Sequence, residues 1–287
     1  MILGNDRQAV IENIRAAAEN GDFYAKVELN DPTLTPEESK KIIETHLQNR
    51  NTFSFRAKSW AARWITDTLA FALNQNTKIV GLKKAAALTG GAFVTSNHFS
   101  PVENTAIRRM VKKLGKKRLP IVSQVTNLAM PGLVGFLMNY ADVIPLSDDL
   151  QYMHLDFSRL LEEFLEKGEY ILIYPEQEMW FHYRKPRPPK RGAYHFAARL
   201  NTPVISCFVE QRNLPQKDTA EFSKVQFIVH VLDVLYPDPA KSVKENSEAM
   251  CKKDYELKKA AYEKAYGKPL DYGFETADIA GWLGALQ

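Results

Sequence analysis

The chain lacks the sequence features of several protein classes. Its 287 residues include only two cysteines, Cys207 and Cys251, which give neither a disulfide framework nor the spacing of a metal site. There is no run of about 18 apolar residues, so we expect no helix that spans a membrane. Residues 1–6 lack the basic start and apolar core of a secretory signal. We therefore expect a protein of the reducing cytoplasm without a bound metal.

The composition is that of a folded protein with one large domain and an extension. Hydrophobic residues make up 45% of the chain and charged residues 25%, which allows a sizeable core and excludes a disordered protein. No internal repeat or low-complexity tract is present. The net charge of +4 is modest, and we expect no nucleic-acid partner.

From residue 78 onward, short apolar runs alternate with helical patterns, which predicts an α/β domain with a mostly parallel central sheet flanked by helices. We expect strands at 92–95, 119–123, 142–146, 170–174, 203–209 and 225–232. Helices are expected at 103–115, 149–167, 192–200 and 241–266. Before them, helical patterns at 6–20, 36–48 and 56–75 suggest an N-terminal helical extension over 1–76, followed by the main domain over 77–287.

The helix expected at 56–75 combines tryptophans with basic residues. Trp60 and Trp64 lie among apolar positions, with Arg56, Lys58 and Arg63 between them. This combination suits a membrane interface. It equally suits a helix that packs on the core through its tryptophans, and the pattern alone does not separate the two interpretations.

A histidine and a carboxylate follow the strand expected at 92–95. His98 comes after turn-forming residues, and Glu103 opens the next helix. Such a carboxylate can fold back, hold one imidazole nitrogen in its N–H form and leave the other free to take a proton from a hydroxyl. The same residues also suit a loop cap and a carboxylate that complements the helix dipole. The segment alone leaves both interpretations open.

Three blocks of the sequence resemble one known family. Residues 97–103, Asn-His-Phe-Ser-Pro-Val-Glu, are similar to the Asn-His, four residues, Asp block of the glycerolipid acyltransferases, with Glu103 in place of the Asp. Residues 171–178, Ile-Leu-Ile-Tyr-Pro-Glu-Gln-Glu, resemble that family's apolar strand followed by Phe-Pro-Glu-Gly-Thr. Residues 190–205 resemble its basic-Gly-helix-Pro-Val segment. Three blocks in the family's order identify the chain as PlsC-like, similar to the lysophosphatidate acyltransferases.

The resemblance implies a reaction. His98 would act as the general base that removes a proton from the acceptor's hydroxyl or amine, and Glu103 would orient the imidazole and stabilise the imidazolium. The acceptor would attack the thioester of acyl-CoA or acyl carrier protein directly, with no acyl-enzyme intermediate and no cofactor. The extra methylene of Glu103, relative to Asp, still allows it to reach the imidazole.

Two departures from the family concern the acceptor. Gln177 replaces a glycine that lets backbone approach a ligand, so Gln177 and Glu178 would reshape the acceptor pocket around Glu176. Leu146 stands where the family usually has an arginine that holds an acceptor phosphate, which leaves open a lysophospholipid or a phosphate-free lipid-like acceptor. The substrate-binding side chains that we expect are Asn97, Ser100, Glu176, Gln177, Glu178, Arg184, Lys185, Lys190 and Arg191.

Two basic segments follow the candidate catalytic blocks. Residues 104–118 contain seven lysines and arginines, residues 181–191 contain five, and neither segment has a carboxylate. They favour an anionic partner, namely a phosphate-bearing donor, an acidic carrier protein or an anionic membrane surface. Solvated helix faces would give the same pattern. The apolar stretch 130–138 could line an acyl-chain tunnel or belong to the core.

The first hypothesis is a peripheral membrane acyltransferase of phospholipid metabolism at the inner face of the cell membrane. A second hypothesis keeps the fold without catalysis, as a lipid- or acyl-carrier-binding protein. The retained pair of His98 and Glu103 argues against it. A third is a hydrolase with Glu176 and Glu178 as paired carboxylates, but no sugar-binding feature accompanies them.

Overall fold

The computed structural model describes residues 7–29 and 31–284. Within them, one sheet has the strand order β1-β7-β6-β2-β5-β3-β4. All neighbouring strands are parallel except the β6–β7 pair, which is antiparallel. The mostly parallel sheet predicted from the sequence is therefore confirmed. Its strands are β1 (Lys78–Val80), β2 (Ala92–Thr95), β3 (Ile121–Gln124), β4 (Val143–Leu146), β5 (Tyr170–Ile173), β6 (Val204–Lys217) and β7 (Ser223–Leu235).

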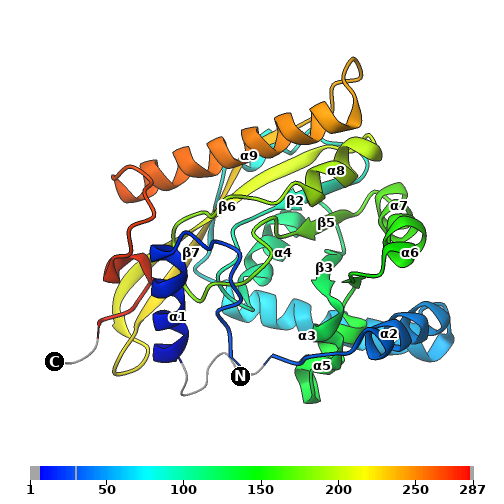
Figure 1. The fold of residues 1–287 in the computed structure, drawn as a ribbon, viewed down its shortest axis with the longest axis horizontal. Helices are drawn as coiled ribbons and strands as arrows, with labels where there is room; N and C mark the ends of the chain where they lie inside the picture. The colour runs from blue at the N-terminus through cyan, green and yellow to red at the C-terminus, as the bar shows by residue number, and fades with distance from the viewer. Residues whose placement is uncertain (1–6, 30, 285–287) are drawn as a thin grey trace.

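Helices cover both faces of the sheet (Figure 1). They are α1 (Arg7–Glu19), α2 (Pro36–Asn49), α3 (Phe53–Leu73), α4 (Glu103–Lys113), α5 (Gly132–Tyr140), α6 (Leu150–Tyr152), α7 (Ser158–Glu166), α8 (Gly192–Arg199) and α9 (Val243–Tyr266). The helix expected at 149–167 is interrupted by a π-helical turn at Met153–Phe157. Helix α5 was not predicted, because its nearly continuous apolar sequence carries no amphipathic period.

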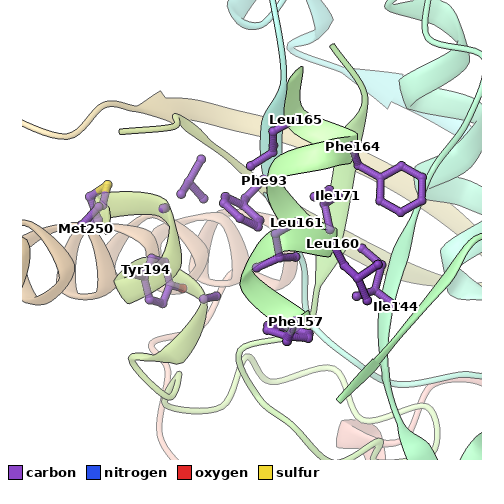
Figure 2. Close-up of a cluster of buried hydrophobic side chains, with 14 of the residues drawn as sticks. Phe93, Ile144, Phe157, Leu160, Leu161, Phe164, Leu165, Ile171, Tyr194 and Met250 are labelled. Carbon is purple, nitrogen blue, oxygen red and sulfur yellow. The ribbon is translucent and has the colours of Figure 1, made fainter. Parts of the chain in front are cut away.

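Strand alternation divides the core into two layers. On one face of the sheet, Phe93 and Ile171 pack with α7, α8 and the start of α9. Figure 2 shows the α7 side chains Leu160, Leu161 and Phe164 gathered in this cluster. On the other face, Val94 and Leu172 pack against the apolar stripe of α4. Strand β2 is thus buried on both sides, which fixes the position of the loop that follows it.

The N-terminal helices pack on the rest of the chain. The apolar side of α1 lies against Trp180, Phe181 and Tyr183, and α3 packs against α4 and α5. The proposed boundary at residue 76 stays a prediction. None of the described helices is long and apolar enough to cross a membrane. The expectation about a secretory signal concerns residues 1–6, which lie outside the described residues.

Helix α3 exposes a row of aromatic side chains. Phe53, Trp60, Trp64 and Phe71 are between 62% and 88% exposed, and their spacing places them in one line along the helix. The tryptophans therefore do not pack the helix on the core, which removes one of the two interpretations of this segment. The buried side of α3 is formed by small residues instead, including Ala62 and Ala70.

Candidate active site

The carboxyl ends of β2 and β5 bring the first two sequence blocks together. The two strands are parallel neighbours, with Thr95 opposite Ile173, so the segments that follow them leave the sheet side by side. Ligand sites of parallel sheets collect at this edge. The loop after β2 carries His98, and the loop after β5 carries Tyr174 and Glu176.

Backbone hydrogen bonds join the two loops. The His98 N–H donates to Glu176 Oε2 at 3.1 Å, and the Trp180 N–H donates to the His98 carbonyl at 3.1 Å. The His182 N–H donates to the Phe99 carbonyl at 2.7 Å. These three hydrogen bonds restrict the backbone of His98 and Phe99. The loop after β5 therefore holds the loop after β2 in place.

The imidazole of His98 is fixed on two sides. Its Nδ1 lies 2.5 Å from Glu103 Oε1, and its ring stacks on Tyr174 with the centroids 4.0 Å apart and the planes 10° from parallel. Glu103 is fully buried, whereas the His98 side chain is 20% exposed. Among the described residues, Nε2 has no hydrogen-bond partner, and it is not buried.

This arrangement determines which nitrogen is available. Because a carboxylate accepts the Nδ1–H, the neutral ring carries its lone pair on Nε2, which points to the open side of the site. Burial excludes water from Glu103 and strengthens its interaction with the imidazole. A side chain of this kind can accept a proton from a hydroxyl brought to Nε2.

Comparison with known proteins agrees with this geometry. Residues 76–210 match the family model described as Acyltransferase. The chain carries an acyltransferase domain. Its structure resembles the crystal structure of the 1-acyl-sn-glycerophosphate (LPA) acyltransferase PlsC from Thermotoga maritima, with a TM-score of 0.52 and 14% sequence identity over 92% of this chain and 98% of that one. A search of curated proteins gives no match.

The acyltransferase assignment and the PlsC-like fold expected from the sequence are thus confirmed. The matched range includes His98, Glu103 and Glu176, so the site described above lies inside the acyltransferase domain. The roles of the individual side chains rest on their own contacts.

Glu176 forms a buried clamp in the acyltransferase domain. It is 3% exposed, its Oε1 accepts the Arg187 backbone N–H at 3.0 Å, and its Oε2 accepts the Arg187 guanidinium at 3.1 Å as well as the His98 N–H. Arg187 also donates to the carbonyls of Phe23 and Glu178 and lies 4.5 Å from the Trp180 ring centroid. These contacts engage both carboxylate oxygens inside the protein, and the expected contact of Glu176 with the acceptor stays a prediction.

Asn97 and Ser100 also have internal partners. Asn97 donates to the Val209 carbonyl at 3.1 Å and accepts the Val209 N–H at 2.8 Å, which extends the pairing of β2 with β6. Ser100 accepts the Val102 N–H at 3.3 Å in the turn before α4. Both are nearly fully buried. In the structure, both side chains contact the backbone of the protein itself. The expected substrate contacts stay predictions.

The basic residues of 184–191 mostly tie other segments to the domain. Lys185 is buried and pairs with Asp278 at 2.7 Å, since a buried ammonium needs a carboxylate partner. Its expected contact with substrate stays a prediction. Arg184 donates to the Ala277 carbonyl, and Lys190 lies over the Tyr24 ring. Arg191 forms an exposed ion pair with Glu248.

Gln177 and Glu178 continue the loop after Glu176. Gln177 is exposed and has a φ of 65°, in the left-handed region that favours glycine. This conformation accounts for a glycine at the corresponding place of the family block. Glu178 is half-buried and contributes its carbonyl to Arg187. Neither side chain is part of the dyad.

The earlier basic segment is largely engaged as well. Arg108 and Lys112 pair with Asp67, and Arg118 pairs with Asp142. Two further members donate to backbone carbonyls, Arg109 to Asn74 and Lys116 to Gly90. Five of the seven basic residues thus hold α3, β4 and the loop before β2 on the domain, a role that the charge pattern alone did not indicate.

Two site residues were not predicted from the sequence. Tyr174 was recognised only as part of an apolar strand, although an aromatic residue at the corresponding place in the family block was an available signal. Arg187 was counted only as one of several basic residues. Its burial depends on the segment around Phe23, 164 positions earlier, and no local pattern marks it.

Proposed function

We propose that the protein transfers a fatty acyl group from acyl-CoA or acyl carrier protein to a hydroxyl of a lysophospholipid or similar lipid acceptor, with His98 as general base and without a cofactor. The observation that carries the proposal is the pairing of buried Glu103 with His98, whose Nε2 is not buried and has no hydrogen-bond partner among the described residues. Lysophospholipid is the acceptor class that the family resemblance favours.

The proposed reaction needs one base and no covalent intermediate. His98 Nε2 takes the proton of the acceptor hydroxyl as its oxygen attacks the thioester carbonyl, and a new ester C–O bond forms. The C–S bond breaks, and the imidazolium returns the proton to the sulfur, which leaves as a free thiol. Glu103 stabilises the imidazolium between these steps. Atoms and charge balance without a further reactant.

The exposed face of α3 supports a peripheral position at an anionic membrane. The row of Phe53, Trp60, Trp64 and Phe71 gives a helix face of the kind that lies in a membrane interface. The end of α3 also lies beside the start of α4, because Asn74 donates to Thr105 at 2.7 Å. A lipid acceptor in that membrane would therefore meet the protein close to Glu103 and its histidine.

The first test measures thiol release from acyl-CoA and from acyl carrier protein with lysophospholipid, glycolipid and phosphate-free acceptors. We expect acceptor-dependent release that falls at least about 10³-fold in His98→Ala. His195→Ala, on the outer face of α8, is the matched control and should keep full activity. Bound lipid with no release by the unmutated protein would favour a non-catalytic lipid-binding protein instead.

The membrane position is tested separately by co-sedimentation with phosphatidylglycerol vesicles. Trp60→Ser combined with Trp64→Ser should weaken vesicle binding by about tenfold or more, since two exposed aromatic side chains are lost. Activity on a water-soluble short-chain acceptor should stay unchanged, because neither side chain touches the dyad. Equal vesicle binding by the double variant would contradict a membrane role of α3.

A further inference from the structure

Tyr174 contacts the dyad directly, although no role at the site was predicted for it from the sequence. Its ring covers one face of the His98 imidazole at a centroid distance of 4.0 Å. A phenylalanine would stack in the same way, and the related family block carries phenylalanine at this place. The hydroxyl is thus an addition that stacking does not explain.

Tyr174 Oη and Glu103 Oε2 are both buried, and neither has a hydrogen-bond partner among the described residues. Burial raises the pKa of Tyr174 well above its ordinary value, and the facing charge of Glu103 raises it further. The phenol therefore keeps its proton and can act as a donor at any pH that the enzyme meets.

We propose that Tyr174 is a positioning residue whose hydroxyl donates to Glu103 Oε2, so that the carboxylate is held by His98 on one oxygen and by Tyr174 on the other. The contact completes a chain from Tyr174 through Glu103 to His98. A buried carboxylate with a single partner would be free to turn and would bear an unsatisfied oxygen. This inference rests on the proposed role of His98 as the base.

Two departures from the family pattern occur together at this contact. The chain has Glu103 where the family has aspartate, and Tyr174 where the family has phenylalanine. The longer carboxylate adds a rotatable bond, which increases the number of orientations that must be excluded for catalysis. A donor on its second oxygen restricts that added freedom, so the tyrosine hydroxyl compensates for the longer side chain.

Of the two carboxylates near His98, Glu103 contacts the imidazole ring and Glu176 contacts the backbone. From the loop after β5, Glu176 accepts the His98 backbone N–H rather than a ring nitrogen, and Arg187 neutralises it. From α4, Glu103 faces both the imidazole and the phenol. In the proposal, the Tyr174 hydroxyl therefore acts on the same carboxylate, Glu103, that contacts His98 Nδ1.

The test is a cycle of Tyr174→Phe, Glu103→Gln and the double variant, with kcat, KM and thermal unfolding measured for each. We expect Tyr174→Phe to lower kcat about tenfold, equivalent to about 1.4 kcal/mol in the barrier, with KM and the unfolding temperature nearly unchanged. In the Glu103→Gln background the same change should cost less than about twofold, because there is no carboxylate left to position. Tyr183→Phe removes another buried hydroxyl without a partner among the described residues and should leave kcat unchanged.

The rate–pH profile separates positioning from a merely structural effect. Without the phenol donor, the carboxylate presents its full charge to the imidazole, so protonation of the His98–Glu103 pair becomes easier. The acid limb of kcat/KM should move to higher pH in Tyr174→Phe and stay in place in Tyr183→Phe. Equal profiles, or a tenfold loss that persists in the Glu103→Gln background, would overturn the inference. If His98→Ala keeps its activity, the proposed function fails instead, which is a different result.

Discussion

Two buried carboxylates contact His98, one at the imidazole and one at the backbone, and their surroundings differ. Glu103 faces an imidazole that is neutral until it takes up a proton, together with a phenol. Glu176 faces a permanent cation, Arg187, and two backbone N–H groups. Burial lowers the pKa of the Arg187 guanidinium, but Glu176 acts in the opposite direction and favours its charged form.

In the proposed mechanism, this difference separates a catalytic role of Glu103 from a supporting role of Glu176. The charge of Glu103 is not balanced until the imidazole takes up a proton, so it favours proton transfer to His98. The charge of Glu176 is already balanced by Arg187, so Glu176 stabilises the loop that holds the His98 backbone. The two carboxylates are therefore expected to respond differently to the same substitution, loss of charge with shape retained.

The largest expected effect is that of Glu103→Gln on turnover. Glutamine fills the same space but cannot stabilise the imidazolium, so kcat should fall about 10³-fold. Single-turnover acyl transfer measures the chemical step directly. The free energy of unfolding should change by less than about 1 kcal/mol, since an amide oxygen still accepts the Nδ1–H. A large loss of stability with normal turnover would show that Glu103, like Glu176, supports the structure and does not take part in catalysis.

Glu176→Gln should instead lower stability. It leaves the Arg187 guanidinium buried without its carboxylate, which costs about 3 kcal/mol in the free energy of unfolding, measured by urea denaturation. Combining it with Arg187→Met removes both charges, and part of the loss should be recovered. Strictly additive losses in the double variant would show that the pair is not coupled.

The sequence was sufficient for the dyad because its geometry is local. A strand end, a turn and a helix start place His98 and Glu103 within five positions of each other, and helix α4 begins at Glu103 as expected. Periodicity and turn chemistry encode these features directly.

The supporting contacts were beyond the sequence because they depend on tertiary burial. Lys185 was expected to bind substrate, and Arg187 was counted only among the basic residues of 181–191. The structure buries both and pairs them with Asp278 and Glu176. Helix α5 and the exposed row of α3 depend on which faces other elements cover. Neither charge pattern nor helical period specifies the partner that buries a given face.

Glu28 is a third carboxylate that sharpens the comparison, because no ion pair joins it to a cation in the part of the chain that the structure describes. Burial raises the pKa of Glu28 to about 7, and the charge of Asp31 raises it further. The folded state therefore favours the protonated form, and this contribution is present below about pH 4.5 and lost as the pH rises to about 7. Glu28→Gln should raise the free energy of unfolding by about 1 kcal/mol at pH 8, after allowance for partial solvent exposure. At pH 4 it should have little effect, and an equal gain at both pH values would contradict this explanation.

The smallest expected effect separates the clamp of Glu176 from the backbone next to it. Gln177 adopts a left-handed conformation with a φ of 65°, which is unfavourable for a side chain with a Cβ atom. Gln177→Gly should therefore raise the free energy of unfolding by about 0.5 kcal/mol, the strain relieved less the greater backbone entropy of glycine in the unfolded chain. Gln177→Ala is the matched control and should give no gain, because it keeps the Cβ atom. If the buried contacts of Glu176 rather than this turn hold the loop, the acyl-transfer rate of Gln177→Gly will equal that of the unmutated protein, and a slower rate would show that the turn itself positions His98.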